Sequence, residues 1–307
     1  MNEHPTTRRR WRPSILLIAT AVAAFAGATV LAYSPAASWI SSYNQSLIVS
    51  HYTEDVRTTQ PSAAEQLAEA RAYNAALSSG ALVKANSNIP TGNGTSSDQR
   101  FDYEKLLSTP NGTMARIQVP AIGVDLPIYH GTSDATLAKG AGHLEGTSLP
   151  VGGVNTHAVI TAHRGLADAT MFTDLDKVKT GDTFIITTFG KVLTYRVVDT
   201  RVVDPSDTTT LRQEAGRDLV TLITCTPLGI NTQRILVTGQ RVLPTPDKDA
   251  ATAAKPPVLV TFPWWLIFYL TAIALISIYL WWAGRVPDKT RRTGAVDTAR
   301  TLGGRAP

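Results

Sequence analysis

The chain contains a single cysteine, Cys225, whose position is suited to chemistry. It follows the β-type run 219–224 and precedes the turn-forming sequence Pro227-Leu228-Gly229. A strand that stops at such a turn carries its last side chain to the rim of a sheet. A thiol has an ordinary pKa of about 8.5, so it needs a base or a cation nearby to act as a nucleophile at neutral pH. The alternative is that Cys225 is a small buried hydrophobe.

A histidine and an arginine stand at similar points in the sequence. His163 ends the apolar run 158–162, and Arg234 opens the run that follows Cys225, nine positions on. A hairpin would bring Cys225 and Arg234 to the same rim. A nucleophilic cysteine needs a base such as His163 and a donor to the oxyanion of its tetrahedral intermediate. These three residues are therefore the candidates for nucleophilic thiol chemistry.

Other residues of the same types compete for these roles. Arg164 and Arg241 are the competing cations, and for both we expect a solvated position at the surface. Of the other histidines, one lies in a tail and one in a helical region, while the three in turn-rich stretches or at the start of a strand are expected to be structural. In chain order, the other histidines are His4, His51, His130, His143 and His157.

Short β-type runs separated by turn residues surround the candidates. The runs are rich in Val, Ile, Thr and Tyr, and no long amphipathic helix lies between them. Such spacing favours a closed β-barrel or a sandwich. The predicted strands are 115–119, 158–161, 183–188, 193–198, 219–224 and 235–239.

The segments on either side of the β-rich part have a different character. Ser62 to Glu65 forms a capping-box sequence, and helical spacing continues until Gly80. Residues 87–99 are rich in Asn, Ser, Gly and Thr, which is typical of a loop or linker. Residues 244–257 are rich in Pro, Ala and Lys, which predicts a stiff spacer.

Two uncharged apolar segments flank this central region. Residues 14–34 contain no charge over 21 positions, and residues 258–284 contain none over 27. Each is long enough to cross a bilayer as a helix. Basic clusters in the tails 1–13 and 285–307 predict that both termini are cytoplasmic and that the central region is extracellular. The first segment also fits a signal peptide cleaved at the sequence Ala24-Phe25-Ala26.

The distribution of charge argues against nucleic-acid binding. The formal net charge is +5, from 29 basic and 24 acidic residues, but residues 35–257 hold 19 basic and 21 acidic residues. The basic excess therefore lies in the two tails. The sequence has no metal-ligand spacing, phosphate loop or nucleotide motif, so we expect no cofactor and no metal.

Several separated motifs surround the candidate residues. Residues 221–234 read TLITCTPLGINTQR, which resembles the TLxTC box of sortases followed by the TPxGxNTxR sequence of class C sortases. Further matches are GHLEGTSLP at 142–150, AHRG at 162–165, FTDLD at 172–176 and VDPSDT at 203–208. From about Tyr103 to Arg241, the chain resembles a class C, pilus-assembling sortase.

The resemblance implies an eight-stranded sortase β-barrel over residues 102–243, preceded in 35–101 by a helical segment and a possible lid loop. It assigns the catalytic roles to Cys225, His163 and Arg234. Thr224 belongs to the TLxTC box and is expected to shape the substrate cleft, with strand packing as the alternative. Class C sortases carry an Asp-Pro-aromatic tripeptide in the lid, and the segment Leu82–Arg100 has none.

The function implied by the resemblance is that of a membrane-anchored cysteine transpeptidase at a Gram-positive cell surface. It would cleave an LPxTG-like sorting signal, form a thioester and transfer the acyl group to a pilin lysine. One rival is a cell-wall-anchoring sortase that uses a peptidoglycan amine. Others are a secreted thiol protease that uses water and a non-enzymatic β-domain that scaffolds pilins around an inert Cys225.

Overall fold

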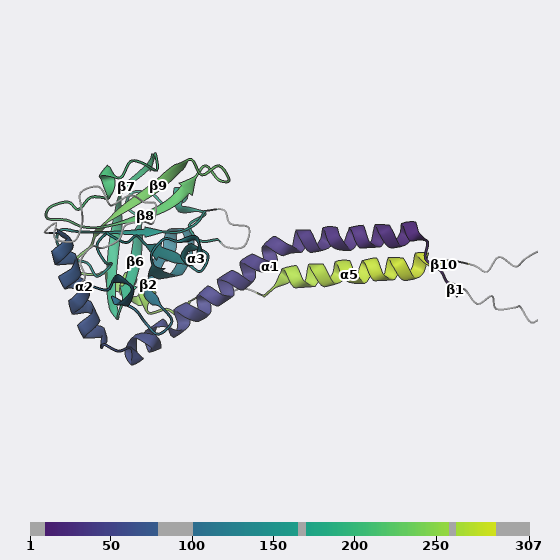
Figure 1. The fold of residues 1–307 in the computed structure, drawn as a ribbon, viewed down its shortest axis with the longest axis horizontal. Helices are drawn as coiled ribbons and strands as arrows, with labels where there is room; N and C mark the ends of the chain where they lie inside the picture. The colour runs from purple at the N-terminus through teal and green to yellow at the C-terminus, as the bar shows by residue number, and fades with distance from the viewer. Residues whose placement is uncertain (1–9, 79–100, 165–169, 258–261, 287–307) are drawn as a thin grey trace, which may run out of the picture. The chain divides into compact units, whose positions relative to one another are not determined.

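The computed structural model describes residues 10–78, 101–164, 170–257 and 262–286. It divides into two compact units, one of residues 1–33 and 264–307 and one of residues 34–263. Helix α1 (Ile15–Thr58) begins in the first unit and ends in the second (Figure 1). The possible lid segment, Leu82–Arg100, lies outside the described residues.

The first unit contains two apolar helical segments. The first part of α1 and helix α5 (Trp264–Ala283) are long and apolar enough to cross a membrane, and a signal sequence would meet the same criterion at the N-terminus. Within this unit, the hydroxyls of Thr29 and Tyr269 are 3.0 Å apart. The short strands β1 (Arg10–Trp11) and β10 (Arg285–Val286) pair in antiparallel fashion.

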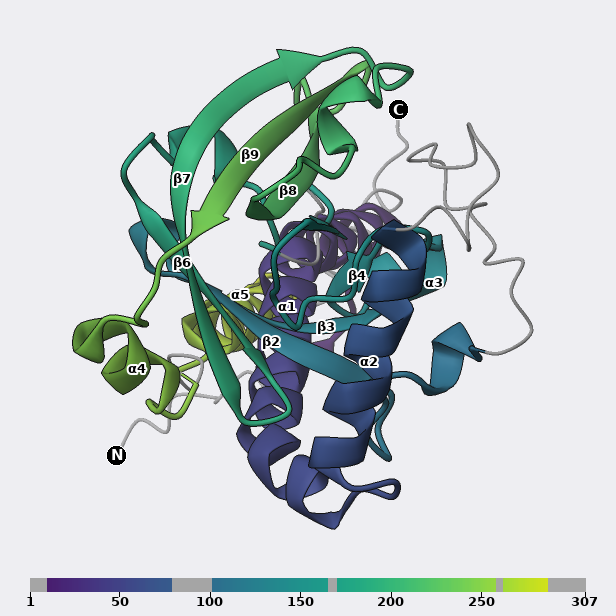
Figure 2. The ribbon, with the colours of Figure 1, turned by 90° about the vertical axis from the view of Figure 1, so that its left-hand side faces the viewer.

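The second unit is built on a closed barrel of eight strands, as the resemblance implied. The strand order is β2-β3-β4-β5-β8-β9-β7-β6. The pairs β3–β4 and β5–β8 are parallel, and the other neighbours are antiparallel. Figure 2 shows β9 between β7 and β8. The strands are β2 (Thr113–Val119), β3 (Val124–His130), β4 (Ala141–His143), β5 (Thr156–Thr161), β6 (Thr183–Thr188), β7 (Lys191–Val203), β8 (Asp218–Thr226) and β9 (Gln233–Arg241).

Two of these strands, β3 and β4, were not among the predicted runs. Pro127 lies inside β3, and proline normally argues against a strand interior. Strand β4 has only three residues, and its central Gly142 is required by close packing. A Cβ atom at this position would lie 2.3 Å from the carbonyl oxygen of Gly131. Contacts with residues distant in the sequence therefore determine that both segments form strands.

The end of α1 and the following helix pack against the barrel. Helix α1 continues well past the predicted boundary at residue 34, because its Tyr52 is buried in the barrel's core. The Tyr52 hydroxyl donates to Met114 O at 3.1 Å and accepts from Phe189 N at 3.0 Å. Helix α2 (Ala63–Ser78) begins at the predicted capping box, in which Ser62 N donates to Glu65 Oε2 at 2.8 Å.

The predicted stiff spacer, residues 244–257, is partly helical. Helix α4 (Asp247–Ala253) occupies its middle. From β2, Arg116 Nη1 donates to Ala253 O and Lys255 O, each at 3.1 Å, while its guanidinium pairs with Asp125 at 2.6 Å. The composition of this segment could not show these contacts, because their donor lies in a distant strand.

The remaining helical elements are short. They are α3 (Asp134–Leu137) and the 3-10 helices η1 (Tyr103–Lys105), η2 (Pro120–Ile122), η3 (Leu175–Lys177) and η4 (Thr209–Leu211).

Candidate active site

The hairpin of β8 and β9 brings Cys225 and Arg234 together, as predicted. They are direct partners in the antiparallel ladder. Side chains that oppose each other in this way project from the same face, with Cβ atoms about 5 Å apart. Cys225 is a free thiol and is half-exposed, as is Arg234. The guanidinium of Arg234 is oriented by bonds from Nη1 to Asn231 O and Gln233 O, both 2.9 Å.

Strand β5, which leads to His163, pairs with β8 on the side away from β9. The parallel ladder pairs Thr161 with Ile223, and Ala162 N then donates to Ile223 O at 3.1 Å. Continuing this register by two residues brings His163 level with Cys225. The side chain of His163 is half-exposed. Cys225 and Arg234 therefore lie on adjacent strands at one rim of the barrel, and His163 follows the end of the neighbouring strand β5 by two residues.

These residues share the outer face of the sheet. Residues of the same parity on β5, β8 and β9, namely Val159, Ile223 and Leu236, form a small apolar cluster separate from the barrel interior. Residues of the other parity, including Ile160, Leu222 and Ile235, belong to the main core. Side chains alternate between the faces of a strand, so the candidate residues continue the outer cluster toward the rim.

Thr224 is placed differently from the cleft position expected for it. Its side chain is fully buried, and its hydroxyl donates to Ala162 O at 2.8 Å. A buried hydroxyl with this partner cannot line an open cleft. It instead joins β8 to the residue that precedes His163.

The two competing arginines are not solvated, which corrects the expectation for both. The side chain of Arg164 is only 11% exposed and pairs with Asp176 at 2.9 Å. Arg241 is 10% exposed, and its guanidinium lies 5.7 Å from the ring centre of Tyr195. Arg241 ends β9, seven residues from Arg234, which is about 20 Å along the strand. Arg241 is therefore too far from Cys225 to serve its chemistry.

Comparisons with known proteins agree with this geometry. A family model described as the sortase domain matches residues 117–242. A sortase C-1 from Actinomyces oris is 48% identical, covers 59% of this chain and 99% of its own, and superposes with a TM-score of 0.53. The chain belongs to the sortase family. Sortases are cysteine transpeptidases, so this sortase is an enzyme of that type.

Further relatives support the same grouping. A sortase C from Streptococcus pneumoniae, described for its catalysis and pilin substrate specificity, is 39% identical, with a TM-score of 0.54 over 62% of this chain and 92% of its own. Sortase D of Bacillus subtilis is 28% identical over 156 residues, which are 50% of this chain and 75% of that protein. Both structural neighbours named here are thus sortases C, that is, class C enzymes.

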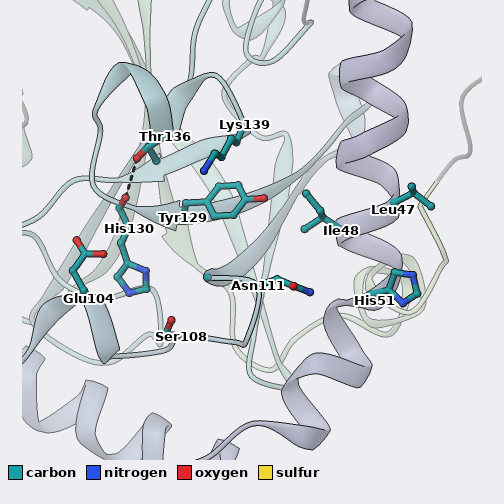
Figure 3. Close-up of a pocket in the computed structure, with 11 residues that line it drawn as sticks. Leu47, Ile48, His51, Glu104, Ser108, Asn111, Tyr129, His130, Thr136 and Lys139 are labelled. Carbon is teal, nitrogen blue, oxygen red and sulfur yellow. Dashed lines mark hydrogen bonds between the residues drawn. The ribbon is translucent and has the colours of Figure 1, made fainter.

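A cavity of about 610 Å³ lies on another face of the barrel (Figure 3). Leu47, Ile48 and His51 of α1 form one wall, and Tyr129 of β3 and Asn111 stand opposite. None of Cys225, His163 and Arg234 lines it. The candidate thiol, imidazole and guanidinium therefore lie away from this cavity.

Three of the other histidines are buried and hold structural hydrogen bonds. Burial lowers the pKa of His130, His143 and His157 below the ordinary value. His143 Nε2 lies 2.8 Å from Ser148 O, which can only accept, so Nε2 carries the proton. Nδ1 is then free to accept from the Tyr103 hydroxyl at 2.9 Å. These contacts require a neutral imidazole, which confirms the expected structural role of His143.

The buried His143 predicts that the fold loses stability in mild acid. Burial lowers its pKa to about 4 from an ordinary value of 6.5. Between these values the unfolded chain binds a proton that the fold excludes, so stability is complete above about pH 6.5 and falls as the pH drops toward 4. We expect His143 to account for a loss of about 3 kcal/mol in the free energy of unfolding.

This effect is measured by denaturant unfolding of the full chain in detergent at a series of pH values. The variant His143→Gln lacks the titrating group and should show a weaker pH dependence between pH 6.5 and 4, by up to one proton. Asp218, whose pKa is raised by burial, acts in the opposite direction in both proteins. Equal pH slopes for the two proteins would contradict the prediction.

Proposed function

We propose that this sortase cleaves an LPxTG-like sorting signal and transfers the acyl group to a lysine amine of a pilin. The observation that carries the proposal is that Cys225 and Arg234 are direct partners in the β8–β9 ladder, while His163 follows the end of β5, the strand that pairs with β8 on its other side. The class C identity of the structural neighbours supports pilins as the substrates.

In the first half-reaction, the Cys225 thiolate attacks the threonyl carbonyl carbon of the sorting signal. A C–S bond forms, and the carbonyl becomes an oxyanion that accepts hydrogen bonds from Arg234. When the oxyanion collapses, the C–N bond to glycine breaks. The His163 imidazolium gives its proton to the departing amine as a general acid. A thioester between the substrate and Cys225 remains.

In the second half-reaction, a lysine amine of another pilin attacks the thioester carbonyl. Neutral His163 accepts the proton that the amine loses, and the collapse of the intermediate breaks the C–S bond. The products are an isopeptide bond and the Cys225 thiolate beside a His163 imidazolium, which is the starting state. Over the two half-reactions together, the imidazole therefore gives up one proton and accepts one.

A peptidoglycan amine is the alternative acceptor, because the same three residues would serve either amine. Class C neighbours favour the pilin lysine. The decisive experiment is mass spectrometry of surface polymers from cells with and without the protein. Lysine isopeptide bonds between pilin subunits that disappear with the enzyme support the proposal. Loss of only peptidoglycan-linked proteins would assign the alternative.

We also propose that both apolar helices span the plasma membrane, with cytoplasmic termini and an extracellular catalytic domain. Helix α1 runs unbroken from Ile15 to Thr58, and its Tyr52 belongs to the barrel core. Cleavage after Ala26 would cut this helix, which favours a retained anchor over a signal peptide. A tether near the bilayer raises the effective concentration of a substrate whose sorting signal is still held at the membrane.

Replacement of the thiol tests the nucleophile directly. Cys225→Ala should abolish the thioester intermediate, because alanine has no atom that can form it. The melting temperature should change by no more than a few degrees, since Cys225 is half-exposed at a rim. Mass spectrometry of the enzyme after incubation with a sorting peptide gives the readout. A covalent acyl-enzyme in this variant would refute the assignment.

Replacement of the guanidinium tests the oxyanion donor. Arg234→Lys keeps the charge but loses the planar set of donors, so we expect kcat to fall about 100- to 1000-fold. The matched control is Arg196→Lys on the exposed side of β7, which should behave like the wild type. Peptide turnover is measured for both. Wild-type turnover by Arg234→Lys would remove Arg234 from the mechanism.

A further inference from the structure

The residues on either side of Cys225 are joined to the residues on either side of His163. Before the cysteine, the Thr224 hydroxyl donates to Ala162 O at 2.8 Å. After it, Arg164 Nη1 donates to the Thr226 hydroxyl at 2.8 Å. Cys225 and His163 are thus each bracketed by two cross-strand hydrogen bonds. The second of these bonds lies beyond the last paired residues of β5 and β8.

The guanidinium of Arg164 is fixed from three directions. Its Nε donates to Thr173 O at 3.0 Å, its Nη2 pairs with Asp176 at 2.9 Å, and its Nη1 reaches Thr226. The side chain is 11% exposed. A planar guanidinium presents its donors in a rigid arrangement. Arg164 therefore holds the end of β8 at a fixed position relative to Thr173 and Asp176.

His163 needs such support because it lies outside the regular ladder. Strand β5 ends at Thr161, two residues earlier, and beyond Cys225 the chain turns at Pro227, where Ile230 N and Asn231 N donate to Pro227 O. The hydrogen bond from Arg164 to Thr226 links the segment that follows β5 to the end of β8. Loss of this bond would leave the imidazole and the thiol on segments that can shift relative to each other.

We propose that Arg164 is a positioning residue of the reaction, acting through Thr226 to hold the His163 imidazole at the level of the Cys225 thiol. The inference rests on the roles proposed above for His163 and Cys225. Three of the nitrogens of Arg164 are engaged with protein groups, so Arg164 orients the site and leaves the oxyanion to Arg234.

The proposal is tested by a double-mutant cycle of Arg164→Gln and Thr226→Val. A displacement of about 1 Å can cost about 100-fold in rate, so each single change should slow formation of the thioester about 10- to 100-fold. KM for a sorting peptide should change less than about twofold. Because both changes break one bond, the double variant should be no slower than the slower single variant. Single-turnover mass spectrometry of the acyl-enzyme measures the rate.

Conservative and control variants separate positioning from general stability. Thr226→Ser keeps the hydroxyl and should restore the rate to near that of the wild type. Thr226→Val leaves the Arg164–Asp176 pair in place, so it tests the bond even if Arg164→Gln fails to fold. Arg196→Gln on the exposed side of β7 is the matched control and should leave the rate unchanged. All rates are referred to the folded fraction from near-ultraviolet circular dichroism.

In the rate measurements, two results would overturn the inference. One is a double variant whose loss is the product of the single losses, because the two side chains would then act independently. The other is a folded Thr226→Val variant with the wild-type rate.

A second readout keeps this test separate from the proposed function. The rate at which iodoacetamide alkylates Cys225 needs no sorting peptide, and it should fall in both single variants because the imidazole is drawn away from the thiol. One outcome is that the wild type fails to cleave sorting peptides while alkylation is still slower in both single variants, and no slower in the double variant than in the slower single one. The proposed substrate is then wrong and the positioning role stands. Unchanged alkylation in both variants would reject the positioning role.

Discussion

The site depends above all on the register with which β8 pairs with β5 on one side and β9 on the other. One pairing sets Cys225 opposite Arg234, and the other brings His163 level with Cys225. Side chains alternate along a strand, so a slip of β8 by one residue would turn the thiol into the barrel interior. The chemistry proposed for this enzyme therefore exists only in this register.

Burial on both faces of β8 holds this register. Leu222 and Thr224 face the interior, while Ile223 packs in the outer cluster with Val159 and Leu236. A series of buried hydrogen bonds also favours this register. His157 Nδ1 donates to Arg212 O at 2.8 Å, so its Nε2 accepts from the Thr221 hydroxyl at 2.7 Å. A slipped strand would leave these buried groups without partners, which is costly.

The rest of the domain supports the three strands without a disulfide. Closure of the barrel leaves no free sheet edge. Tyr52 of α1 bonds to Met114 of β2 and to Phe189 in the β6–β7 turn, and Arg116 draws α4 onto β2. In an oxidising compartment, such a fold can keep one cysteine unpaired for its chemistry.

The sequence alone predicted the candidate residues of the site and most of the strands that hold them. The type and spacing of Cys225 and Arg234 predicted their hairpin, and the motif at 221–234 together with the shorter motifs before it indicated the family. Other features were decided by tertiary structure. Strands β3 and β4, the docking of α4 and the burial of Thr224 and Arg164 depend on partners far away in the chain. The local sequence pattern indicates turns and the alternation of apolar and polar residues within one strand. Packing and hydrogen bonds between distant strands form only in the folded barrel.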